Sequence, residues 1–76
     1  MSAGEIVITT FLTKPQIAAA LAIWKKGGFQ IRQIAELVIR PHIKEINKKL
    51  GQKNNVTYLA YVVENAFNQM YPDHKR

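Results

Sequence analysis

Residues 31–50 have the sequence IRQIAELVIRPHIKEINKKL, which contains most of the apolar periodicity and five of the eleven basic residues of the chain. At the helical period of about 100° per residue, the segment carries two apolar stripes. The first stripe ends at Val38, and the second begins at Ile39 about a quarter turn further around the helix. The stripes consist of Ile31, Ile34, Ala35 and Val38, and of Ile39, Ile43, Ile46 and Leu50.

The rotation between the two stripes falls beside Arg40 and Pro41. Proline lacks a backbone N–H and clashes with the carbonyl group four residues earlier, which costs about 3 kcal/mol inside a helix but is tolerated in its first turn. The sequence therefore predicts two helices that meet at an angle, over residues 30–39 and 41–50, with a bend or a short turn at Arg40. A single helix with a kink is the alternative.

Polar side chains of the same segment form a stripe of their own. Gln33, Arg40, Lys44 and Lys48 follow one another at spacings of seven, four and four residues, and Asn47 lies beside them. Residues 30–53 hold six basic and two acidic residues, which accounts for four of the six net positive charges of the chain. This stripe predicts a basic helix surface opposite the apolar one.

The stretch before the central segment predicts a strand and a helix. Residues 5–12, EIVITTFL, are rich in β-branched side chains and predict a short strand. Thr13 and Gln16 have the spacing of a capping box, so we expect a helix over residues 14–26 that ends at Gly27.

The stretch after the central segment predicts the last helix, over residues 56–70. Asn54 or Asn55 can cap it, and Pro72 stops it. The run VTYLAYVV favours a strand by propensity alone, but the apolar period continues through Met70 and favours a helix.

Together these patterns predict a mainly α fold. We expect three to four short helices in a compact helix-turn-helix-like domain with a short N-terminal β-strand. A chain of 76 residues forms one domain, residues 1–76, with mobile tails at residues 1–4 and 72–76.

The composition narrows the classes of function. A hydrophobic fraction of 47% is that of a folded domain, and the absence of cysteine excludes disulfides and cysteine-based zinc sites. The N-terminus lacks the features of a signal peptide, and no stretch is long enough to span a membrane. We therefore expect a cytoplasmic protein with no membrane partner. The net charge of +6 suits a polyanionic partner such as DNA or RNA.

The residues needed for catalysis or metal binding are largely missing. The only serine is Ser2, and His42 and His74 do not share a metal-ligand spacing. We therefore expect neither an enzyme nor a protein that binds a metal or another cofactor. Each glutamate of the central segment has a basic residue four positions later, which is typical of a surface ion pair. These pairs are Glu36 with Arg40 and Glu45 with Lys49.

The basic stripe predicts a nucleic-acid-binding surface. In a helix-turn-helix domain the second helix presents polar side chains to the major groove, where lysine and arginine contact phosphate or guanine and asparagine contacts adenine. A solvated face that only keeps the protein soluble is the alternative. The expected binding residues are Arg32, Gln33, Arg40, Lys44, Asn47, Lys48 and Lys53, with Lys25 and Lys26 as further backbone contacts.

A ribbon-helix-helix arrangement is a second geometry with the same order of elements. In it the strand over residues 5–12 would pair with its copy in a dimer and enter the groove. Neither face of that strand offers a basic or amide side chain to a base edge, so we favour the helical surface. A homodimer could form through this strand or through the helix that carries Tyr58 and Tyr61.

The function expected from the sequence is nucleic-acid binding by a small basic protein. A DNA-binding transcriptional regulator or accessory factor fits the charge pattern best. The alternative is a protein-interaction module, such as an inhibitor, an adaptor or an antitoxin-like partner, that makes no contact with nucleic acid.

Overall fold

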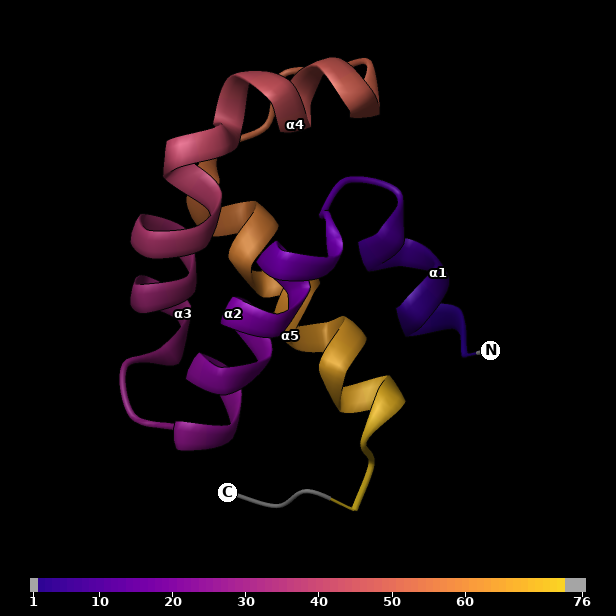
Figure 1. Ribbon diagram of the computed structural model, residues 1–76, viewed down its shortest axis with the longest axis vertical. Helices are drawn as coiled ribbons and strands as arrows, with labels where there is room; N and C mark the ends of the chain where they lie inside the picture. The colour runs from indigo at the N-terminus through magenta and orange to yellow at the C-terminus, as the bar shows by residue number, and fades with distance from the viewer. Residues whose placement is uncertain (1, 74–76) are drawn as a thin grey trace.

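The computed structural model describes residues 2–73, and all secondary structure in that range is helical. The helix α5 crosses the molecule, with α1 on one side, α2 and α3 on the other, and α4 across one end (Figure 1). The elements are α1 (Ala3–Thr9), α2 (Lys14–Lys26), α3 (Gln30–Gln33), the π-helix η1 (Ile34–Ile39), the 3-10 helix η2 (Arg40–His42), α4 (Ile43–Leu50) and α5 (Val56–Met70).

The strand expected over residues 5–12 is wrong, because this stretch forms most of α1 and the turn that follows it. Ser2 caps the helix by accepting a hydrogen bond from the backbone N–H of Glu5 at 3.2 Å. The side chains of Ile8, Phe11 and Leu12 lie in the core. Strand propensity spans only about 1 kcal/mol per residue, whereas burying one large apolar side chain contributes about 1.5–3 kcal/mol. Core packing therefore outweighs the local preference.

The mobile tails expected at the two ends are described only in part. At the N-terminal end, Ser2 caps α1, and the helix begins with Ala3 and Gly4. At the C-terminal end, a turn of Pro72 and Asp73 follows α5. The remaining tail positions, 1 and 74–76, lie outside the described residues.

Gly4 lets α1 approach α5 closely. A Cβ atom at this position would overlap the backbone carbonyl of Ala66. In agreement with this contact, α1 packs more extensively against α5 than against any other helix. A residue without a side chain is therefore required where the two helices meet.

We expect Gly4→Ala to lower the free energy of unfolding by about 1–2 kcal/mol. Overpacking costs about 1–3 kcal/mol, and the better helix propensity of alanine offsets up to about 1 kcal/mol of it. Urea denaturation followed by the fluorescence of Trp24, the single tryptophan, measures the change. The neighbouring exposed variant Ala3→Ser should stay within about 0.5 kcal/mol of wild type. A Gly4→Ala protein as stable as wild type would contradict the close approach.

The helices α2 and α5 form where the sequence predicts them. Thr13 and Gln16 make both hydrogen bonds of the capping box, at 2.9 and 3.4 Å, and α2 ends at Gly27 in a positive-φ conformation. Asn55 caps α5 by accepting a hydrogen bond from the N–H of Tyr58 at 2.8 Å.

The chain is helical without a break from Gln30 to Leu50. The N–H of Arg40 bonds to the carbonyl of Ala35, five residues earlier, as in a π-helix. The N–H of Ile43 then bonds to the carbonyl of Arg40, three residues earlier, as in a 3-10 helix. Figure 1 shows the bend between α3 and α4 that these segments produce. The two helical halves that the sequence predicts therefore meet at a bend, which lies in the 3-10 helix of residues 40–42, where the backbone of His42 departs from helical values.

The π-helix also explains why the two apolar stripes are offset. A π turn holds about one residue more than an α turn, so the residues after it are rotated back by about 100°. This rotation is in the direction that brings the second stripe onto the side of the first. Ile34 and Val38 from the first stripe and Ile39 and Ile46 from the second are consequently all buried in one core.

The core lies between α5 and the helical segments that surround it, namely α1, α2 and the segment from α3 to α4. The ring of Trp24 from α2 packs against Phe67 of α5, with 5.4 Å between the ring centres and 44° between their planes. The buried apolar side chains are Ile8, Phe11, Leu12, Ala20, Trp24, Ile34, Ala35, Val38, Ile39, Ile46, Leu59, Ala60, Val63, Ala66 and Phe67.

Candidate nucleic-acid interface

The helix α4 has one face in the core and one face in solvent. Ile46 is buried, whereas Lys44, Lys48 and Lys49 are exposed. Lys53 follows in the exposed connection to α5. We call Lys44, Lys48, Lys49 and Lys53 the α4 lysine cluster.

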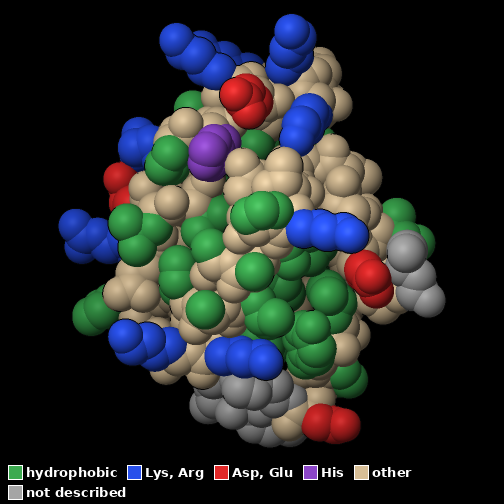
Figure 2. Space-filling view, in the orientation of Figure 1, with side chains coloured by type: hydrophobic (Ala, Val, Ile, Leu, Met, Phe, Trp, Pro, Cys, Tyr) green, Lys and Arg blue, Asp and Glu red, His purple; other side chains and the backbone are tan. Residues whose placement is uncertain are grey.

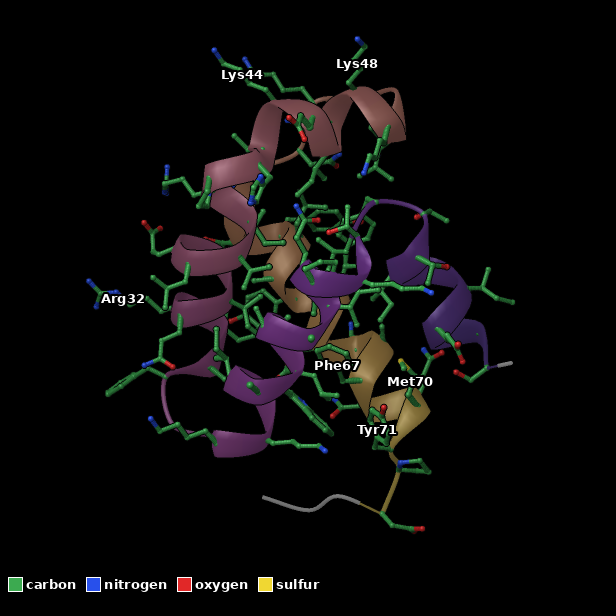
Figure 3. All side chains as sticks on the ribbon, in the orientation of Figure 1. Arg32, Lys44, Lys48, Phe67, Met70 and Tyr71 are labelled. Atoms are coloured by element: carbon green, nitrogen blue, oxygen red, sulfur yellow. The ribbon has the colours of Figure 1, made fainter. Side chains whose placement is uncertain are left out.

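The cluster projects from one end of the molecule. Figure 2 shows basic side chains at the end where α4 lies. In Figure 3 the side chains of Lys44 and Lys48 point away from the body of the protein. Lys44 and Lys48 thus face outward together, because the buried Ile46 fixes how α4 is rotated about its axis.

No lysine of the cluster forms an ion pair within residues 2–73, although Glu45 is exposed on the same helix. Between residues 2 and 73, the one ion pair with a separation of 4.0 Å or less joins Arg40 to Glu36. The second pair expected from the sequence, between Glu45 and Lys49, does not form. The positive charges of the cluster are therefore available to an external anion.

Arg40 begins η2, just before α4, and is engaged with Glu36. Its Nε and Nη2 atoms donate to the two carboxylate oxygens, each at 2.9 Å. The hydrogen bond from Arg40 holds the pKa of the Glu36 carboxyl below its ordinary value, and the nearby charge of Arg32 adds to the effect. The same hydrogen bond raises the pKa of Arg40. This expected surface pair is confirmed, and it directs Arg40 toward η1.

Asn47 is turned toward the connection that follows α4. Its Oδ1 atom accepts a hydrogen bond from the N–H of Asn54 at 2.9 Å, and its Nδ2 atom donates to the carbonyl of the same residue at 3.4 Å. Gly51, with a φ of 72°, ends the helix. The N–H of Gln52 reaches back to the carbonyl of Asn47 at 3.3 Å, which completes the hydrogen-bond pattern of a glycine-ended helix. Asn47 therefore holds the connection that carries Lys53.

Lys53 and Arg40 border a hollow of about 560 Å³ at the start of α5. Asn55 and Thr57, from the N-cap and the first turn of α5, also line this hollow. The amino end of a helix carries a partial positive charge, which adds to the charge of Lys53, whereas the charge of Arg40 is paired with Glu36.

The other expected binding residues lie elsewhere on the molecule. Arg32 and Gln33 are exposed on α3, and Figure 3 shows Arg32 well separated from Lys44 and Lys48. Lys25 and Lys26 end α2 at the opposite end of the molecule from α4 (Figure 1).

One member of the cluster, Lys49, was not among the binding residues expected from the sequence. A lysine in the last turn before Gly51 is favoured by the negative end of the helix dipole, so Lys49 was interpreted as part of the helix end. Its exposure as a member of the α4 lysine cluster was therefore not predicted.

The described part of the chain contains no group of three or more His, Asp or Glu side chains arranged to hold a metal ion. Among the same residues, none of the helices combines the length and the apolar character needed to cross a bilayer. Comparisons with family models, with curated proteins and with solved structures found no match.

Proposed function

We propose that this protein binds nucleic acid, with the α4 lysine cluster as the main contact to the phosphate backbone. The observation that carries the proposal is the presence of four exposed lysines at one end of the molecule without a carboxylate within 4.0 Å among the described residues. A lysine ammonium group is a compact charge on a flexible stem and suits contact with phosphate oxygens. Polyanions bind such clusters by releasing condensed counterions.

Contact with phosphate is favoured over reading of bases. Bidentate recognition of guanine or adenine requires a free arginine or an amide side chain in the groove. Arg40 donates to Glu36 and Asn47 bonds to Asn54, so both side chains have partners within the protein. We therefore propose an accessory DNA-binding protein with little sequence preference rather than a sequence-specific regulator. RNA offers the same phosphate chemistry.

The start of α5 supports the same proposal. Lys53 precedes the amino end of this helix and lines the same hollow as Asn55 and Thr57. Because a helix amino end favours anions, a phosphate next to Lys53 would gain from both charges.

We expect the affinity for a random DNA duplex to fall steeply with salt. If each lysine of the cluster neutralises one phosphate, the plot of log K against log salt should have a slope of about −3 to −4. Fluorescence anisotropy titrations at several salt concentrations measure this slope. Lys44→Gln with Lys48→Gln should flatten the slope by about 2, whereas Lys25→Gln with Lys26→Gln should leave it unchanged. A salt-independent affinity would contradict the proposal.

A protein-interaction module is the second candidate. It is favoured by Tyr58 and Tyr61 of α5, which are 58% and 51% exposed. Tyrosine is enriched in protein interfaces because it combines an apolar ring with a hydroxyl group. A protein partner that survives nuclease treatment, and whose binding is unchanged when Lys44 and Lys48 become glutamate, would favour this candidate over the first.

A further inference from the structure

The most exposed large apolar side chains of the described residues are Phe29 and Leu37, at 81% and 66% exposure. They line one hollow of about 350 Å³ together with Arg32, Gln33 and Glu36. We call these five residues the Phe29–Leu37 face. Scattered exposed apolar residues are common, but two that border the same hollow indicate a contact surface.

The face is self-complementary under a two-fold rotation. In sequence position, Gln33 is the midpoint between Phe29 and Leu37, and Ile34 is the midpoint between Arg32 and Glu36. Two copies of this segment, packed antiparallel about an axis near Gln33, would set Phe29 of each copy against Leu37 of the other. The same axis brings Arg32 of each copy toward Glu36 of the other, so that every contact occurs twice.

We propose that a second copy of this chain covers the Phe29–Leu37 face in a two-fold symmetric dimer. The charge of the face argues for this occupant. It presents one cation, Arg32, and one carboxylate, Glu36, so its charges are of both signs, as a surface that contacts its own copy requires. A second copy supplies the opposite charge at each position.

Glu36 keeps its bond to Arg40 in such a dimer. A carboxylate offers about four lone-pair sites on its two oxygens, and Arg40 occupies one site on each oxygen. The remaining sites can accept Arg32 of the other copy. The pair within the chain thus positions the Glu36 side chain for the contact between chains.

The dimer leaves the α4 lysine cluster uncovered. Figure 1 shows α3 along one side of the molecule and α4 across its end, and Arg32 is distant from Lys44 and Lys48 in Figure 3. An interface of standard size covers about 800 Å² of each partner, roughly one sixth of the 5082 Å² accessible surface of this chain. The inference does not rest on nucleic-acid binding, and its test uses protein free of nucleic acid.

The first test is analytical ultracentrifugation over a range of protein concentrations. Wild type should show a monomer–dimer equilibrium, and Phe29→Ser with Leu37→Ser should weaken it at least tenfold. The matched control, Tyr58→Ser with Tyr61→Ser, removes two exposed aromatic side chains from α5 and should leave the equilibrium unchanged. Circular dichroism checks that both variants are folded. A wild-type chain that stays monomeric, or a dimer that survives the Phe29 and Leu37 changes, would overturn the proposal.

The second test uses the two-fold symmetry of the charges. Arg32→Glu and Glu36→Arg should each weaken self-association at least tenfold, because like charges then meet at both symmetric pairs. A mixture of the two variants should form a heterodimer, since every Glu then faces an Arg. Failure of the mixture to associate would overturn the proposed pairing. Binding of the wild-type chain to anionic vesicles is measured as well. If the wild-type chain stays monomeric and binds the vesicles, and Phe29→Ser with Leu37→Ser abolishes that binding, the face contacts a membrane and the proposed dimer is wrong.

Discussion

Lys48→Glu with Lys49→Glu should weaken the binding of duplex DNA at least about 100-fold at an ionic strength near 0.15 M. By counterion release, each phosphate contact contributes about a factor of five at this salt concentration. Loss of two contacts therefore accounts for about 25-fold, and the two carboxylates add repulsion from the same phosphates. A fluorescence anisotropy titration of wild type and variant against one labelled duplex measures the change.

Lys25→Glu with Lys26→Glu is the matched control for this experiment. Both pairs lie in the last turn of a helix, so both substitutions change the net charge equally and disturb the helix dipole in the same way. The control pair ends α2, away from α4 (Figure 1), and should weaken binding less than about fivefold. If both variants weaken binding equally, the protein responds to net charge alone and the α4 lysine cluster is not the site.

The helices that the sequence predicts correctly are those with strong local signals at their ends. Thr13 and Gln16 satisfy the first N–H groups of α2, and Gly27 supplies the positive φ that ends it. Asn55 plays the capping role for α5. Such signals act within four residues of sequence, so they can be recognised without knowing the fold.

The error at α1 has a different origin. Ile8, Phe11 and Leu12 are spaced as on one face of a helix, but the β-branched composition of this stretch favours a strand. A local helix signal stood just before this stretch, because Ser2 and Glu5 have the spacing of a capping box and Ser2 accepts a hydrogen bond from the N–H of Glu5. The close approach of Gly4 to Ala66, by contrast, joins residues that are far apart in sequence. No local pattern in residues 5–12 reports that contact.

The candidate site was predictable in outline only. The amphipathic period of α4 places Lys44 and Lys48 outward, and both are exposed. The engagement of Asn47 with Asn54 depends on the conformation of the connection after Gly51, which the helical period does not describe. The Phe29–Leu37 face was not predicted either, although Leu37 belongs to neither apolar stripe of the sequence and is exposed.

Deletion of Leu37 should leave the protein folded. The π-helix η1 holds about one residue more than an α-helix of the same length, and Leu37 is exposed. Its removal allows η1 to become α-helical while Ile39 and Ile46 remain on the core side. Far-UV circular dichroism and cooperative urea unfolding should therefore resemble wild type. Because Leu37 also belongs to the Phe29–Leu37 face, the comparison is made at concentrations where wild type is monomeric.

Deletion of Asn65 is the matched control, since Asn65 is also exposed and lies within the regular helix α5. Removing one residue there rotates the remainder of the helix by about 100° and turns Phe67 away from the core. Loss of a buried phenylalanine alone costs about 3–5 kcal/mol, a large part of the stability of so small a domain. We expect the Asn65 deletion to unfold the chain. If the Leu37 deletion unfolds it as well, the π-helix is not what brings the two apolar stripes into one core.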